Sequence, residues 1–112
     1  MKIAFSARGS DMNALVDPRF GRAAYLVVFD EESAEVSNFD NSAISSVAHG
    51  AGLQTAQKLV DMEANVLITG NGPGGNASTV LKKSNVKVFV GAAEMTLHDA
   101  YDAYKKNALK EF

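Results

Sequence analysis

The stretch that decides the fold is Val-Leu-Ile-Thr-Gly-Asn-Gly-Pro-Gly-Gly-Asn-Ala, which runs from Val66 to Ala77. It begins with a short apolar run rich in β-branched residues, which predicts a buried strand. Glycines follow at positions 70, 72, 74 and 75, and then Ala77, Val80 and Leu81 repeat at helical spacing. A strand, a glycine-rich loop and a helix in this order direct backbone N–H groups and a helix N-terminus toward an anion.

The glycine-rich loop has two interpretations. Four glycines in six residues allow positive φ and a close approach of the backbone to a ligand. The spacing is neither G-x-G-x-x-G nor G-x-x-x-x-G-K-[ST], so the dinucleotide and P-loop mechanisms do not carry over. The alternative to ligand binding is a plain tight turn between a strand and a helix, and the number of glycines favours a ligand slightly.

Length and composition predict a single domain over residues 1–112. A chain with 46% hydrophobic and 21% charged residues can bury a core. Its net charge of −2 argues against a general nucleic-acid-binding face. No apolar run reaches the ~18 residues of a membrane span. The first residues enter a strand pattern without a signal peptide, so we expect a cytoplasmic protein.

Several kinds of chemistry are excluded or disfavoured. The chain has no cysteine, which excludes disulfides, thiolate zinc sites, cysteine nucleophiles and ordinary thiolate-ligated iron–sulfur clusters. The first and fourth predicted strands carry no carboxylate, which disfavours metal-dependent phosphoryl chemistry. His49 has no identifiable carboxylate partner, which disfavours general acid–base catalysis.

The rest of the pattern predicts a mixed α/β protein with the element order β-β-β-α-β-α-β-α. Strands are expected over residues 3–5, 24–29, 34–39, 66–68 and 86–90, and helices over 49–63, 76–85 and from 96 onward. The last helix begins at a capping box at Thr96, includes Ala108 on its inner face and has Lys110 near its end. A right-handed crossover makes the fourth and fifth strands parallel, and the first strand is expected to run with them. The result is a five-stranded mixed sheet flanked by helices.

All three arginines, Arg8, Arg19 and Arg22, lie in one loop over residues 8–22. A guanidinium group offers a planar fork of donors suited to multi-oxygen or similar anions. The alternative is a solvated loop whose arginines pair with Asp11 and Asp17. In the predicted topology this loop, His49 and the glycine-rich loop meet at the carboxyl edge of the sheet, where open α/β sheets usually bind ligands.

Two groups of motifs carry a family resemblance. One is Asp17-Pro18-Arg19-Phe20-Gly21-Arg22-Ala23; the other combines His49-Gly50-Ala51-Gly52 with residues 66–74 and 86–89. Across essentially the whole chain they resemble the dinitrogenase iron–molybdenum cofactor biosynthesis family, which includes NifX-like proteins, the C-terminal part of NifB and small proteins of the orange-protein type. The resemblance implies a ribonuclease H-like α/β fold with a mixed five-stranded sheet. It also implies non-covalent binding of metal–sulfur clusters or their precursors.

The resemblance further implies a carrier or scaffold rather than an enzyme. Its cargo would be a preassembled anionic sulfide cluster containing molybdenum, such as a molybdenum–copper sulfide cluster, held by a monomer for storage, delivery or signalling. The partners implied are the cluster and cluster-delivery or signalling proteins, with no nucleic acid and no membrane. The alternative function is a phosphate- or nucleotide-binding module that uses the glycine-rich loop. A hydrolase or nuclease is suggested by the implied fold alone, which does not argue function.

The expected cluster-binding residues come from the same motifs. Many NifX-like members have His-Phe-Gly where this chain has Arg19-Phe20-Gly21, which suits anion pairing better than metal ligation. His49 is the candidate metal ligand or hydrogen-bond donor, Met12 is a candidate soft contact, and His98 is expected at the surface. The predicted set is Arg8, Met12, Arg19, Phe20, Gly21, Arg22, His49, Gly50, Asn71, Gly72, Gly74 and Gly75.

Overall fold

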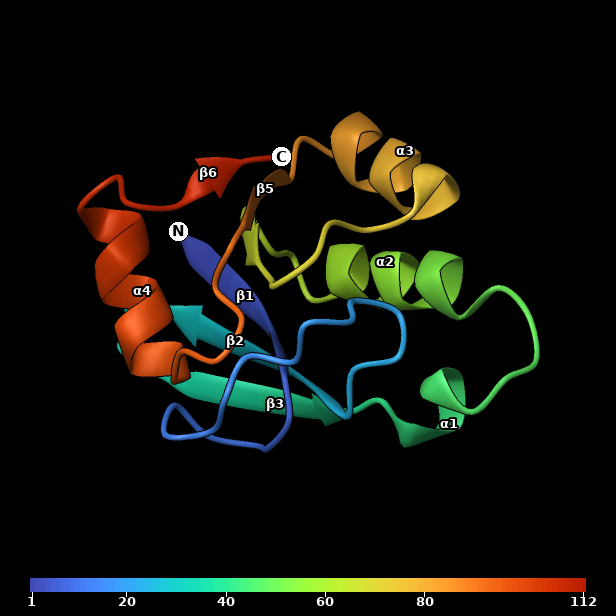
Figure 1. Ribbon diagram of the computed structural model, residues 1–112, viewed down its shortest axis with the longest axis horizontal. Coiled ribbons are helices and arrows are strands. Elements are labelled where there is room, and N and C mark those ends of the chain that lie inside the picture. The colour runs from blue at the N-terminus through green and yellow to red at the C-terminus, as the bar shows by residue number, and fades with distance from the viewer.

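The computed structural model, which describes residues 1–112, has a mixed six-stranded sheet with helices on both faces (Figure 1). The strands are β1 (Lys2–Ala7), β2 (Tyr25–Asp30), β3 (Val36–Asp40), β4 (Val66–Ile68), β5 (Lys87–Val90) and β6 (Lys110–Glu111). The helices are α1 (Ser42–Ser45), α2 (Ala51–Asp61), α3 (Gly75–Lys83) and α4 (Leu97–Lys105). The predicted mixed α/β class is confirmed.

The strand directions bring the ends of three strands to one edge. The order across the sheet is β3-β2-β1-β4-β5-β6, with β1, β4 and β5 parallel and β2 antiparallel to both β1 and β3. The prediction that β1, β4 and β5 run parallel and that β2 and β3 form a hairpin is therefore confirmed. The chain segments that follow β1, β4 and β5 all leave from this edge, which we call the carboxyl edge.

The sixth strand and the end of the last helix correct the prediction. α4 ends at Lys105, and Asn107 takes a left-handed conformation with φ of 58°, which is a common way to terminate a helix. Ala108 is therefore exposed outside the helix, and Lys110 lies in β6, antiparallel to β5. β6 occupies the edge of β5 that would otherwise leave its backbone groups unpaired. The four-residue helix α1 was also not predicted.

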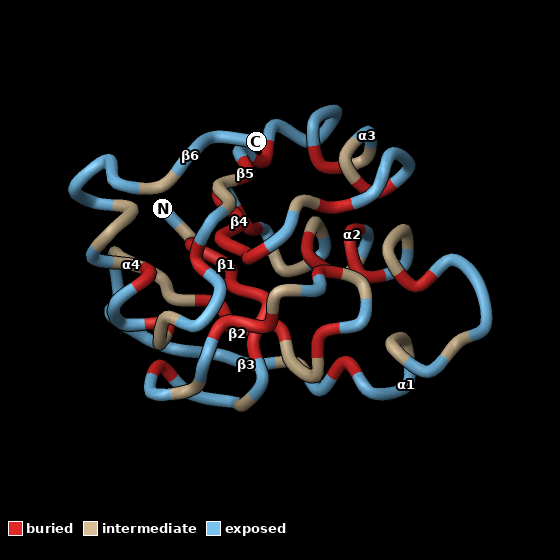
Figure 2. The backbone as a smooth tube through the Cα atoms, in the orientation of Figure 1, coloured by how far each residue is buried: buried red, intermediate tan, exposed pale blue.

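The core lies on both faces of the sheet, as the buried central strands in Figure 2 show. Side chains alternate along β1, so Ala4 contributes to the cluster beneath α2 and α3 while Ile3 and Phe5 contribute to the cluster beneath α4. In Figure 1, α4 lies apart from the α2–α3 pair, on the other side of the sheet. None of the helices has the length and apolar character that crossing a bilayer requires.

A hydrogen bond from Tyr101 connects α4 to the turn between β2 and β3. Its hydroxyl donates to Glu31 Oε2 at 2.5 Å, and Lys105 Nζ lies 3.2 Å from the same oxygen. The hydrogen bond lowers the pKa of Glu31 and, with burial, raises the pKa of Tyr101 to about 12. Because the folded pKa of Tyr101 exceeds its unfolded value, this contribution to stability is complete below about pH 10 and is lost as the pH rises toward 12.

We expect the Glu31→Gln variant to bring the pKa of Tyr101 down toward the ordinary value of about 10, because the charged acceptor is gone. The measurement is a spectrophotometric titration of the tyrosines, with Tyr101→Phe used to assign the late step. Glu32→Gln, which changes an exposed neighbouring carboxylate, is the control. An unchanged late step in Glu31→Gln would contradict the account.

Candidate functional site

The segment Asp17–Arg22 crosses the carboxyl edge between the glycine-rich loop and the start of α2; we call it the edge segment. On one side, the amide of Asn71 donates to the carbonyl of Pro18 at 2.8 Å, and a Cβ at Gly70 would lie 2.6 Å from Pro18 Cα. On the other side, a Cβ at Gly21 would lie 2.6 Å from Gly52 Cα. These glycines let three loops from distant parts of the sequence meet backbone to backbone.

Buried hydroxyl groups hold the first end of the edge segment. Ser6 and Thr69 come directly after the last residue pair between β1 and β4, which is Phe5 with Ile68. Both side chains are fully buried, and their hydroxyl oxygens are 2.6 Å apart. Ser6 Oγ donates to the carbonyl of Asp17 at 2.8 Å, and the amide of Asp17 donates to the carbonyl of Ser6 at 2.8 Å. Because these groups are buried, breaking one bond would leave an unpaired polar atom, which fixes Asp17 in place.

Two further buried side chains, those of Asn41 and Thr55, hold the second end of the edge segment. Asn41 Nδ2 donates to the carbonyl of Ala23 at 3.0 Å and to Thr55 Oγ1 at 3.3 Å, while Thr55 Oγ1 donates to the carbonyl of Gly21 at 3.2 Å. Both side chains are fully buried, and Asn41 Oδ1 has no protein partner. The edge segment is therefore anchored at both ends by side chains from β1, from α2 and from the residues that follow β3 and β4.

Two helices begin side by side next to this segment, at the same end of the molecule in Figure 1. The first intrahelical bonds are Gln54 N to Gly50 O in α2 and Ser78 N to Gly74 O in α3. Neither helix has a side-chain cap or an acidic residue in its first turn, whereas α4 is capped by Thr96, as predicted. The free N–H groups and the helix dipoles make this corner electropositive.

The start of α3 is the more open of the two helix ends. A Cβ built on Gly74 or Gly75 would meet no atom within 4 Å, whereas Gly21 lies against the backbone of Gly52 at the start of α2. No glycine of the loop from Gly70 to Gly75 has positive φ; only Gly50 and Gly91 do. The loop glycines thus serve close packing and open access, and not a left-handed turn.

The three arginine side chains differ in the groups that they contact. Arg19 Nε and Nη2 donate to the buried carboxylate of Asp17 at 3.2 and 3.3 Å, which raises the pKa of Arg19. Arg22 Nη1 donates to the carbonyls of Ser45 and Val47, each at 2.6 Å. Arg8 is exposed and makes no ion pair within the chain. The alternative in which the arginines of a solvated loop pair with Asp11 and Asp17 therefore applies to Arg19 alone.

The predicted residues do not all share one face of the sheet. Phe20 packs in the core cluster beneath α2 and α3, whereas Met12 is 8% exposed in the cluster beneath α4. Arg8 lines a separate hollow of about 300 Å³ with Pro18 and Glu94. The structure therefore brings Arg19, Gly21 and Arg22 together with α2 and the glycine-rich loop, and leaves Arg8 and Met12 on the other side of the carboxyl edge.

The remaining predicted residues surround the helix starts. His49 and Gly50 are exposed just before α2, Asn71 is exposed beyond β4, and Gly72 is half-buried before α3. His98 is exposed, as expected. No group of three or more His, Asp or Glu side chains is placed to hold a metal ion. The donors gathered here are N–H and guanidinium groups, which suit a whole anion rather than a bare cation.

Sequence reasoning did not identify the buried polar contacts that build this corner. Ser6 and Thr69 each come directly after an apolar strand run, and Asn41 follows the third strand. A polar residue at the end of a buried strand is a detectable pattern. Which of these residues pair with one another depends on the strand order, which the sequence gives only indirectly.

Comparisons with known proteins agree across nearly the whole chain. The family model described as dinitrogenase iron-molybdenum cofactor matches residues 1–107. The apo form of the orange protein from Desulfovibrio gigas has a TM-score of 0.93 and 35% identity, over 99% of this chain and 92% of that one. A NifB-like protein from Thermotoga, of the DUF35 family, has a TM-score of 0.83 and 34% identity, over 98% and 91%. No protein with a curated description matches significantly.

Proposed function

Because the chain belongs to the dinitrogenase iron-molybdenum cofactor family, we propose that it binds an anionic metal–sulfur cluster and carries it without catalysing a reaction. The cluster is the cargo of the protein. The observation that carries this proposal is the pair of uncapped helix starts at the carboxyl edge, next to the edge segment that bears Arg19 and Arg22. With no cysteine in the chain, the cluster arrives with its own sulfide.

The donor set fits a sulfide cluster that carries negative charge. Backbone N–H groups at the starts of α3 and α2 would donate to the sulfides, as they do to other anions at helix N-termini. Arg19 and Arg22 would supply positive charge, and His49 would ligate a copper ion or donate a hydrogen bond. We propose a molybdenum–copper sulfide cluster as the specific cargo, supported by the similarity to the orange protein.

The order β3-β2-β1-β4-β5, with β2 antiparallel to its neighbours, supports a ribonuclease H-like classification extended by β6. A carrier of this size would act as a monomer. Its partners would be the proteins that deliver the cluster, receive it or respond to its presence.

The test is an anaerobic titration of the purified chain with tetrathiomolybdate and cuprous ion, followed by gel filtration. We expect the protein to become coloured and to retain molybdenum, copper and sulfide in a fixed ratio. An equal titration with inorganic phosphate and with nucleotides tests the alternative module, since the same donors suit oxyanions. Colourless protein that retains no metal, or binding of phosphate in preference to the cluster, would contradict the proposal.

A further inference from the structure

The last seven residues, 106–112, leave the end of α4, pair with the outer edge of β5 over residues 110–112 and end against the glycine-rich loop; we call them the C-terminal strap. The ring of Phe112 lies so close to Gly72 that a Cβ at this glycine would overlap three ring atoms. Glycine is therefore the one residue that allows this contact without displacing the ring. The loop is held between two neighbours, since Pro18 accepts from Asn71 on its other side.

The end of the strap, residues 110–112, is weakly attached, whereas residues 106–108 are hydrogen-bonded to α4 and Leu109 packs against the core. This end makes two ladder pairs with β5, and the amide of Phe112 donates to the carbonyl of Val88 at 2.8 Å. None of the strap's side chains forms a hydrogen bond or an ion pair, and all of them except Leu109 are exposed. Phe112 itself is 60% exposed, although it is a large apolar side chain. Segments with few buried contacts open locally at low free-energy cost.

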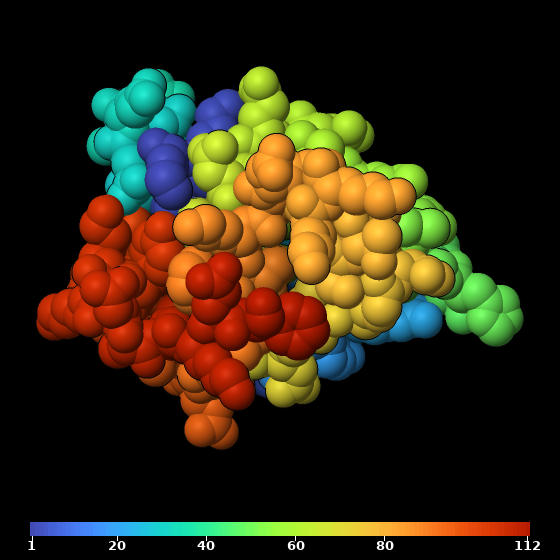
Figure 3. Space-filling model, turned by 90° about the horizontal axis from the view of Figure 1, so that it is seen from above, coloured from blue at the N-terminus to red at the C-terminus, as the bar shows by residue number.

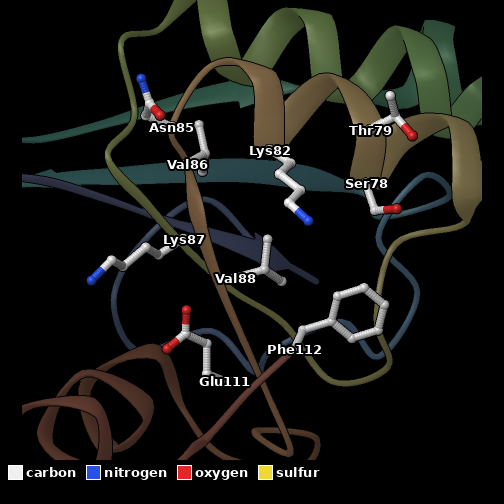
Figure 4. Close-up of a pocket in the computed structure, with 9 residues that line it drawn as sticks. All are labelled: Ser78, Thr79, Lys82, Asn85, Val86, Lys87, Val88, Glu111 and Phe112. Carbon is white, nitrogen blue, oxygen red and sulfur yellow. The ribbon is translucent and has the colours of Figure 1, made fainter.

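A hollow lies between the end of the strap and α3, beside β5. It measures about 590 Å³ and is lined by α3, β5 and the strap, with Lys82, Val88 and Phe112 around it (Figure 4). In the view of Figure 3 the red C-terminal segment lies beside the orange surface of α3 and β5. Residues 110–112 are therefore held by backbone pairing to β5 and by the contact of Phe112 with Gly72.

We propose that the C-terminal strap is a latch that controls exchange of the ligand bound at the start of α3. With Phe112 on Gly72, the loop that presents the free N–H groups of α3 is fixed between Phe112 and Pro18. When the strap leaves β5, Phe112 no longer restrains Gly72. The N–H groups at the start of α3 then lose their fixed position, and the bound anion exchanges faster. This inference rests on the proposed function, since it concerns regulation of the same site.

The test compares Phe112→Ala and Gly72→Ala with the control Val36→Ala, which truncates an exposed apolar residue on β3, at the far edge of the sheet. Each protein is loaded with the molybdenum–copper sulfide cluster, and the rate at which colour leaves it is measured. We expect release about tenfold faster from both latch variants, since each raises the population of the open state. The double variant should be no faster than either single variant, because both remove one contact.

A second readout separates the latch from general loosening. Amide hydrogen exchange of the unloaded protein should be faster at residues 110–112 in both latch variants and unchanged in β1 and β4. Release rates within twofold of the wild type would overturn the latch while leaving cluster binding intact. Failure of the wild-type chain to take up the cluster would overturn the proposed function and the latch together, so the two failures are distinguishable.

Discussion

The Gly21→Ala variant is expected to lose about 2–3 kcal/mol of unfolding free energy, which is a typical cost of overpacking a site that cannot relax. The added Cβ would lie 2.6 Å from Gly52 Cα and 2.7 Å from Gly52 N, both backbone atoms in the first turn of α2. Neither can move aside as a side-chain end could. Relief requires separating the edge segment from α2, which also disturbs the hydrogen bond from Thr55 to the carbonyl of Gly21.

Urea unfolding measures this loss, and Gly75→Ala is the matched control. A Cβ at Gly75 would meet nothing within 4 Å, and alanine suits a first helical position better than glycine does. The control should therefore be neutral or slightly more stable than the wild type. Equal unfolding midpoints for the two variants would show that the edge segment does not pack against α2 as described.

Removing all three arginines is expected to weaken cluster binding about 100-fold, which corresponds to about 3 kcal/mol. The expectation combines the loss of charge-assisted hydrogen bonds from Arg19 and Arg22 with the loss of the long-range attraction of Arg8. Because these side chains are exposed, the difference from the wild type should shrink as the salt concentration rises. The measurement is an equilibrium titration of each protein with the preformed cluster.

The matched control removes the same charge from the opposite edge of the sheet. Lys83, Lys87 and Lys106 are exposed at the end of α3, the start of β5 and the end of α4. Their replacement by alanine should change cluster affinity by less than about threefold, because only a screened field is altered. If the lysine and arginine triples weaken binding equally, net charge rather than the carboxyl edge governs uptake.

The sequence predicted the sheet well because its parallel strands are short, apolar and separated by helical repeats. The glycine-rich loop after β4 and the capping residue of α4 were also identified correctly. The sixth strand was not predicted, because two exposed residues at Lys110 and Glu111 have no strand periodicity. Their pairing with β5 is a tertiary event that follows the turn at Asn107.

The sequence predicted part of the spatial arrangement of the candidate residues. The convergence of the edge segment with the glycine-rich loop followed from the strand order alone. The division of Arg8 and Met12 from Arg22 did not, because it depends on which face of the sheet each part of a long loop crosses. The contact of Phe112 with Gly72 joins residues 40 positions apart, and neither residue shows a pattern that predicts it.

In the proposed binding mode, backbone N–H groups at the paired helix starts hold the anion. The most direct measurement is an NMR titration of the labelled chain with the molybdenum–copper sulfide cluster, followed through the backbone amides. We expect the largest shifts at Gly75, Asn76 and Ala77, with smaller ones at residues 51–53 and in the edge segment. Largest shifts in the hollow around Lys82 and Lys87, or at α4, with the helix starts unchanged, would contradict the account.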